Sequence, residues 1–303
     1  MSHDHHHSHA QTSSSRRIGV VLALTAGYAA AELIGGLLSN SLALLADAGH
    51  MLTDIFALSV ALFATITGRR PADRRNTFGY KRVEILGALF NGTALLVIAV
   101  LIAIEAWTRW DNPPEIDVPM MATVAFGGLI VNLVAAYLLH SDRQQLNIRA
   151  AYYHVLGDLL GSVGALVAAG AIGLFGWRWA DPAASVIISL IILVGAIRLL
   201  MASVHVLLEG VPKHLDIDEV GRALMDVPDV CQVHEMHLWS LRGTEPLLSA
   251  HLVVETADCN DRVLREATVI LRDRFGIDHT TLQIEPADFN IDGDVLQSIR
   301  DRT

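Results

Sequence analysis

The sequence predicts a polytopic α-helical membrane protein with six transmembrane helices and a small α+β domain at its C-terminal end. Of the 303 residues, 52% are hydrophobic and only 18% are charged, and the mean hydropathy is +0.42. These values do not fit a soluble domain with a solvated surface. Six apolar runs reach about the 20 residues that a spanning helix needs. Beyond Val211 the chain becomes more polar and its hydrophobic periods shorten.

The six apolar runs form a predicted membrane domain over residues 16–209. They lie near residues 17–38, 41–67, 83–108, 118–140, 148–176 and 179–209. Most Arg and Lys residues of this domain lie before the first run and in the second and fourth connecting loops, whereas the opposite side receives only Arg109 and Arg178. The positive-inside rule therefore places both termini in the cytoplasm. We expect a multi-pass protein of the cytoplasmic (inner) membrane, in contact with membrane lipid.

Polar segments flank the membrane domain on both sides. Residues 1–15 are His-rich and low in complexity, and we expect a disordered tail there. Residues 210–290 form a predicted cytoplasmic domain, followed by a C-terminal tail over 291–303. Its sequence pattern predicts amphipathic helices over 216–229 and 260–276, and strands over 230–242, 246–256 and 279–285. The order α-β-β-α-β indicates an α+β domain with its helices on one face of the sheet.

Charge and motif content exclude several classes of function. A net charge of −10 argues against nucleic acid as a partner. Cys231 and Cys259 form no Cys-x-x-Cys pair, so neither a disulfide framework nor a thiolate zinc site is indicated. An intramembrane metalloprotease would need an H-E-x-x-H motif and an open coordination position for water, and the sequence lacks that motif. We therefore expect no enzyme and no catalytic cofactor.

Two matched histidine–aspartate pairs lie inside the second and fifth apolar runs. His50 precedes Asp54 by four residues, and His154 precedes Asp158 by four. Residues four apart share one face of a helix, and a charged carboxylate at the bilayer centre costs about 2.5–3.5 kcal/mol. Two such helices side by side would offer two imidazoles and two carboxylates to one ion, a tetrahedral set that Zn²⁺ accepts. The ion would offset this burial, because zinc sites contribute roughly 10 kcal/mol or more.

Residues near these pairs also suit a metal site between two closely packed helices. Asp47 lies three residues before His50, nearly on the same helix face, and is a candidate to orient that histidine or to line the ion's route. Gly157 and Gly161 form a G-x-x-x-G step that lets membrane helices approach closely. Ligands must be deprotonated to hold a metal. Metal and protons therefore compete for the same atoms.

Four segments, SLALLADAGHMLTD, FGYKRVEIL, AYYHVLGDLLGSVG and LLEGVP, resemble the bacterial zinc-exporting branch of the cation diffusion facilitator family. The likeness extends from about residue 16 to about residue 288. It implies a homodimer with a ferredoxin-like or metallochaperone-like cytoplasmic domain, which exports a divalent metal in exchange for protons. The family's transport site falls on His50, Asp54, His154 and Asp158. Members with His at the first position are mostly zinc transporters, and cadmium and cobalt accept similar ligands.

The resemblance also implies a metal site outside the membrane. His234, His251 and Glu285 fall where related proteins hold regulatory metal ions. Zn²⁺ is thus expected both as the substrate and as a regulatory ligand. Some relatives carry His where this chain has Gln283, a departure that weakens the site or removes one ion.

Charged residues outside these two sites complete the predictions. By resemblance, Arg82 and Glu209 form a charge pair that links the third helix to the start of the soluble domain, although Arg82 also suits a simple positive-inside anchor. The N-terminal tail is a candidate for weak metal capture, with a solvated tail or an expression-tag remnant as the alternative. Its histidines are His3, His5, His6, His7 and His9.

Two other functions stay open at this point. A transporter of another divalent metal, such as manganese or iron, would require a harder site that is richer in carboxylates. A membrane-bound metal sensor without flux would need only the C-terminal site and would leave the buried pairs unexplained. A flux assay separates the two classes.

Overall fold

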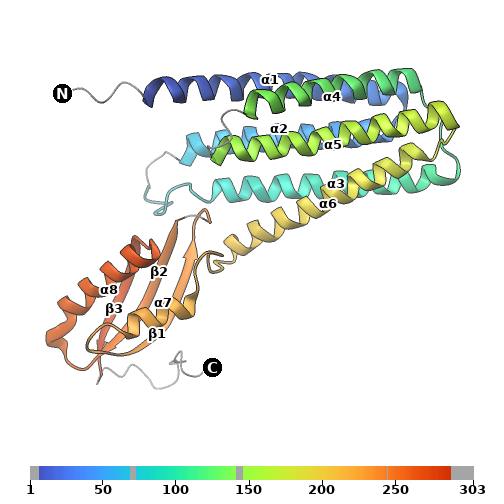
Figure 1. Cartoon of the computed structure of the whole chain (residues 1–303). Coiled ribbons are helices and arrows are strands. Elements are labelled where there is room, and N and C mark those ends of the chain that lie inside the picture. The colour runs from blue at the N-terminus through green and yellow to red at the C-terminus, as the bar shows by residue number, and fades with distance from the viewer. Residues whose placement is uncertain (1–6, 69–72, 141–145, 244, 288–303) are drawn as a thin grey trace. The chain divides into compact units, whose positions relative to one another are not determined.

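The computed structural model describes residues 7–68, 73–140, 146–243 and 245–287 (Figure 1). Within these ranges the side chains of residues 7–22, 54, 57–58, 60–68, 139–140, 146–154 and 257 are not described. The chain divides into two compact units. The first comprises Met1–Leu62 with Phe90–Leu200, and the second comprises Phe63–Leu89 with Met201–Thr303.

Long apolar helices make up the first unit, and some of them extend into the second unit. They are α1 (His7–Ser39), α2 (Leu42–Gly68), α3 (Val83–Asp111), α4 (Val118–His140), α5 (Leu146–Phe175) and α6 (Ala180–Leu207) (Figure 1). Over the described residues, α3 to α6 each contain a stretch long and apolar enough to cross a membrane. The described apolar parts of α1 and α2 are shorter, Ala23–Ser39 and Leu42–Thr53. The predicted fold of apolar membrane helices is confirmed, and each of these helices overlaps one of the predicted apolar runs.

One predicted boundary differs from the structure. We expected residues 1–15 to form a disordered tail, but α1 begins at His7. The residues from there to the predicted boundary include neither Pro nor Gly. A helix that already exists extends readily over such residues, since propagation adds one hydrogen bond per residue ordered. Residues 1–6 and 288–303, which include part of each predicted tail, lie outside the described residues.

Small residues set the close packing of α1, α4 and α5 in the first unit. Ala125 of α4 and Ala165 of α5 are fully buried in one shared cluster. A Cβ atom at Gly128 would lie 2.2 Å from the hydroxyl oxygen of Tyr28, so only glycine lets α1 and α4 approach here. Between α4 and α5, Asn132 Nδ2 donates a hydrogen bond to Ser162 Oγ at 3.3 Å.

The N-terminus of α2 is capped from another helix. Asp181, fully buried in the first turn of α6, accepts hydrogen bonds from the Ser41 hydroxyl at 2.6 Å and from the backbone N–H groups of Leu42 and Ala43 at 2.9 and 3.2 Å. The first N–H groups of a helix have no partner within it, and the helix dipole favours a negative charge there. Asp181 therefore ties α6 to the start of the helix that carries His50.

The C-terminal part of the second unit is the predicted α+β domain. It contains α7 (Ile217–Met225), β1 (Val230–Ser240), β2 (Pro246–Val254), the 3₁₀ turn η1 (Ala257–Cys259), α8 (Asn260–Phe275) and β3 (His279–Pro286). The sheet order is β1-β2-β3, with β1 and β2 antiparallel and β2 and β3 parallel. One core joins Val220 and Leu224 of α7 and Leu271 of α8 to Leu248 and Leu252 of the sheet. The opposite sheet face is left for polar side chains.

Candidate metal sites

The helices α2 and α5 bring one residue of each predicted pair together. His50 Nε2 lies 3.9 Å from Asp158 Oδ1, and the two side chains are 28% and 1% exposed. Small buried residues of α5, Ala165, Ala168 and Ala169, lie two to three turns further along that helix, in a cluster shared with Ala43 and Leu44 of α2. An imidazole and a deeply buried carboxylate from separate apolar helices thus face each other.

The other half of the predicted set stays a prediction. Asp54 and His154 lie on α2 and α5, but their side chains lie outside the described residues. Each is four residues from its described partner, so the two backbone positions are one helical turn from His50 and Asp158. A four-ligand site of two imidazoles and two carboxylates is compatible with this placement.

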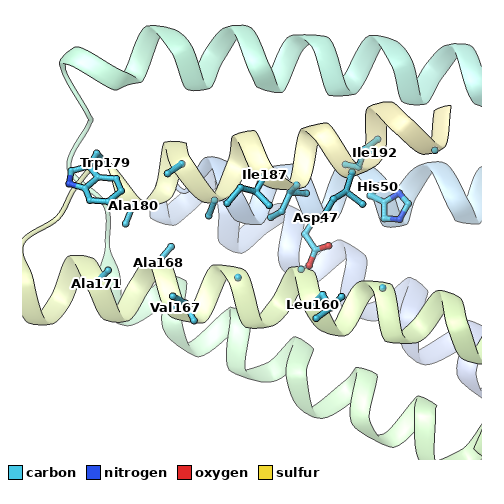
Figure 2. Close-up of a pocket in the computed structure, with 18 of the residues that line it drawn as sticks. Asp47, His50, Leu160, Val167, Ala168, Ala171, Trp179, Ala180, Ile187 and Ile192 are labelled. Carbon is cyan, nitrogen blue, oxygen red and sulfur yellow. The ribbon is translucent and has the colours of Figure 1, made fainter. Parts of the chain in front are cut away.

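A cavity of about 790 Å³ opens beside this pair in the first unit, and Asp47 and His50 both line it (Figure 2). Its other walls are mostly apolar residues of α5 and α6, including Leu160, Ile187 and Ile192, with Leu95 of α3. In Figure 2 the carboxylate of Asp47 points from α2 toward α5. Asp47 is 2% exposed, and a Cβ atom at Gly161 would lie only 2.5 Å from its Oδ1 atom. The glycine of the G-x-x-x-G step therefore makes room for a carboxylate as well as for a helix.

The polar face of the cytoplasmic sheet carries the second candidate site. His234 on β1 is paired directly with His251 on β2, and their ring centroids are 5.0 Å apart. Glu285 on β3 bridges both rings, with Oε2 at 3.1 Å from His234 Nε2 and Oε1 at 2.7 Å from His251 Nδ1. One ligand atom from each of the three residues lies within 4.8 Å of the other two. Two imidazole nitrogens and a carboxylate at this spacing fit a Zn²⁺ ion, so the residues present suit the implied metal.

Gln283 faces the same site but has a different part in it. Its Nε2 atom donates a hydrogen bond to Glu285 Oε1 at 2.7 Å. An amide that donates to a ligand oxygen holds that carboxylate in place but adds no strong metal ligand. Gln283, which stands where some relatives carry His, therefore supports Glu285 instead of binding an ion.

Two ion pairs connect the segment before α3 with the C-terminal part of the second unit. Arg82 donates a hydrogen bond to Glu209 at 2.7 Å, so the two residues of the expected charge pair are in contact. Lys81 contacts Glu245 at 2.5 Å, a pair that the sequence reasoning missed because the residues are 164 positions apart. The hydrogen bond from Lys81 lowers the pKa of the Glu245 carboxyl.

The side chains of the N-terminal histidines lie outside the described part of the structure. His3, His5 and His6 lie outside the described residues, and His7 and His9 belong to α1 without described side chains. Their predicted weak metal capture is therefore a matter for experiment.

Comparison with known families defines the class of protein. Residues 18–208 match the family described as the cation efflux transmembrane domain, and residues 212–287 match the cytoplasmic domain of cation efflux proteins. The chain belongs to this family of multi-pass membrane proteins, the cation diffusion facilitators, as its sequence motifs indicated.

Individual relatives resemble the chain over nearly its whole length. The zinc transporter ZitB of Escherichia coli is 45% identical over 92% of this chain and 92% of its own. The metal cation efflux system protein CzcD of Cupriavidus metallidurans is 42% identical over 93% of this chain and 90% of its own. A cadmium, cobalt and zinc/H⁺-K⁺ antiporter of Bacillus subtilis is 40% identical over 96% of this chain and 95% of its own.

One similar solved structure covers the cytoplasmic part. It is the metal-bound C-terminal domain of the CzcD transporter, which is 35% identical and covers 23% of this chain and 99% of its own, with a TM-score of 0.23.

Proposed function

We propose that this protein exports Zn²⁺, with cadmium and cobalt as further substrates, from the cytoplasm in exchange for protons. The observation that carries the proposal is the approach of His50 on α2 to the buried carboxylate of Asp158 on α5, at 3.9 Å. With Asp54 and His154 one turn away, we propose a transport site of two imidazoles and two carboxylates. This donor set favours zinc over the harder, oxygen-preferring ions such as manganese.

Transport agrees better with this site than catalysis does. A catalytic zinc keeps one coordination position open for water, whereas four protein ligands close the coordination sphere. A closed site inside apolar helices has no activated water to offer to a substrate. It can instead release its ion when the surrounding helices expose it to the other side. The names of the similar transporters and antiporters support this reading.

Exchange with protons follows from the chemistry of the ligands. Imidazole and carboxylate bind metal only in their deprotonated forms, so each proton taken up weakens the hold on the ion. At the face where protons are abundant, protonation of His50 or its neighbours would release Zn²⁺. When Zn²⁺ binds again from the cytoplasm, it would displace that proton into the cytoplasm.

The cytoplasmic domain has a proposed regulatory role. We propose that His234, His251 and Glu285 bind a regulatory Zn²⁺ that favours the transport-competent arrangement. Both termini would then lie in the cytoplasm, and the protein would act in the inner membrane as a homodimer joined partly through this domain. The match to the cytoplasmic domain of cation efflux proteins supports the assignment.

Reconstitution into proteoliposomes tests the transport function. We expect a pH gradient to drive Zn²⁺ uptake, with smaller fluxes of Cd²⁺ and Co²⁺, little flux of Ni²⁺ and Mn²⁺, and none of these fluxes in Asp158→Ala. The matched control is Glu105→Gln, which alters a carboxylate on α3 that is paired with Arg109 of its own helix. Zinc uptake that is equal with and without the gradient would refute the exchange. Uptake by Asp158→Ala at the rate of the unaltered protein would refute the site.

A further inference from the structure

An irregularity in β1 lies beside the cytoplasmic site. His234 pairs with His251 and His237 pairs with Ser249, so two residues of β1 lie opposite the single Ala250 of β2. One extra residue in one of two antiparallel strands is a β-bulge. Glu235 is part of this bulge and has a φ of 44°, which is rare for a residue with a side chain.

The bulge changes which face of the sheet Glu235 occupies. In a regular strand, adjacent residues point to opposite faces, so Glu235 would point into the core that α7 and α8 cover. The structure instead packs Met236 against that core, together with Val233 and Leu238. His234 and Glu235 are therefore consecutive residues on the polar face, and Glu235 lies next to His251.

His251 consequently lies between two carboxylates. Its Nδ1 atom is 2.7 Å from Glu285 Oε1, and its Nε2 atom is 3.7 Å from Glu235 Oε2. A neutral imidazole has one N–H group, and when Nδ1 binds a metal that hydrogen must reside on Nε2. The Glu235 side chain is 39% exposed, so a small movement brings its carboxylate within hydrogen-bonding distance of that N–H group.

We propose that Glu235 is a positioning residue of the cytoplasmic metal site, which acts through His251. Its carboxylate accepts the Nε2 hydrogen, selects the tautomer with a free Nδ1 and holds the ring so that Nδ1 faces His234 and Glu285. A carboxylate behind a metal-bound histidine is a common arrangement, and its loss typically lowers metal affinity about 10–100-fold. The inference rests on the proposed metal binding by the cytoplasmic domain and assigns no ligand role to Glu235.

Because the backbone at Glu235 has a positive φ, one substitution can separate a structural role of this residue from a positioning role. Glycine adopts positive φ without strain, so Glu235→Gly removes the carboxylate while it keeps or improves the fit of the bulge. A purely structural role for Glu235 predicts that this variant is harmless. A positioning role predicts weaker zinc binding without a loss of thermal stability.

The experiment measures zinc affinity of the full-length chain in detergent by competition with a colorimetric chelator. The background carries His50→Ala and Asp158→Ala, and Ser in place of the five tail histidines, so that the cytoplasmic site dominates the signal. On it we compare Glu235→Gly, Glu235→Gln and His251→Ala with the control Glu255→Gln, which changes an exposed carboxylate just after β2.

We expect His251→Ala to abolish tight binding, Glu235→Gly to weaken it about 10-fold or more, Glu235→Gln to weaken it less, and Glu255→Gln to leave it unchanged. Thermal unfolding of Glu235→Gly should occur at or above the temperature of the background chain. If Glu235→Gly binds zinc as tightly as Glu255→Gln while His251→Ala does not bind, the positioning role is wrong and the metal site stands. If His251→Ala also binds normally, both the regulatory site and this inference are wrong, whereas zinc flux through the unaltered chain still tests transport separately.

Discussion

The two candidate metal sites use similar ligands but hold them in different ways. In the membrane, His50 and Asp158 face each other at 3.9 Å, which is longer than a hydrogen bond. In the cytoplasmic domain, Glu285 lies 3.1 Å from His234 and 2.7 Å from His251, and its carboxylate also accepts a hydrogen bond from Gln283. The pair in the membrane lies at the outer limit of an ion pair, whereas the three residues of the second set are joined by shorter contacts.

The difference corresponds to two tasks. An ion that is cargo must leave its site in every cycle, so ligands on separate helices that can move apart suit transport. An ion that reports metal concentration must bind the same groups reversibly without reorganising the fold, and neighbouring strands in fixed register suit that task. Under the proposed function, the helices carry the mobile site and the sheet carries the preformed one.

The largest effect is expected when one residue of each candidate site is removed and the two losses are compared. His50→Ala should reduce zinc flux by more than the roughly 10–100-fold that loss of a supporting partner costs, because it removes a ligand itself. His251→Ala should leave the maximal flux within a few-fold and should instead abolish activation by cytosolic zinc. The measurement is initial uptake by proteoliposomes across a range of zinc concentrations. Equal losses in the two variants would show that both sites serve transport.

A smaller effect is expected where Asp47 lies against α5. In Gly161→Ala the new methyl group would occupy the position of the Asp47 carboxylate, at 2.5 Å from Oδ1. We expect flux to fall about 10-fold, as for the loss of a group that supports a ligand. Gly164→Ala is the matched control, because a Cβ atom there meets nothing within 4 Å. Equal flux in the two variants would show that the position of Asp47 is unimportant.

Most of the fold was predictable because its signals are local. Apolar runs of sufficient length identify membrane helices, and residues four apart share one helix face, so a site shared by His50 and Asp158 could be predicted from the sequence. Gln283 and Glu285 are two residues apart in β3 and therefore share one sheet face, where they form a hydrogen bond. Repeating patterns of this kind need no knowledge of distant contacts.

The features that sequence reasoning missed depend on distant or irregular geometry. Asp181 lies 140 positions from the hydroxyl group that it binds at the start of α2. In a regular strand, Glu235 would point to the opposite face from its neighbour His234. The local sequence does not predict the β-bulge that places both residues on one face. The start of α1 was misplaced because polar residues do not by themselves end a helix that the following apolar residues already support.

A still smaller effect is expected at the charge pair beside α3. Arg82 and Glu209 are both more than a third exposed, and exposed pairs contribute about 0–1 kcal/mol. Arg82→Glu should therefore lower flux by at most about five-fold, and the double variant Arg82→Glu with Glu209→Arg should recover it. Uptake by proteoliposomes at saturating zinc measures both. A failure of the double variant to recover flux would assign Arg82 to anchoring at the membrane surface instead of pairing.

The smallest effect concerns the neighbouring pair of Lys81 and Glu245. The hydrogen bond from Lys81 lowers the pKa of Glu245 below its ordinary value of 4.5. Because the pKa is lower in the folded state, the pair stabilises the fold fully above pH 4.5 and loses this contribution as the pH falls through the lowered pKa.

Thermal unfolding followed by circular dichroism measures this contribution through Lys81→Met. At pH 7 the variant should be less stable than the unaltered chain by under about 1 kcal/mol, since the pair is exposed. The difference should shrink as the pH falls below 4.5 and vanish once Glu245 is protonated in the folded state of both chains. Lys213→Met, which alters an exposed lysine elsewhere in the same unit, controls for the lost positive charge. A difference between Lys81→Met and the unaltered chain that does not shrink as the pH falls below 4.5 would mean that Lys81 stabilises the fold through contacts other than its ion pair.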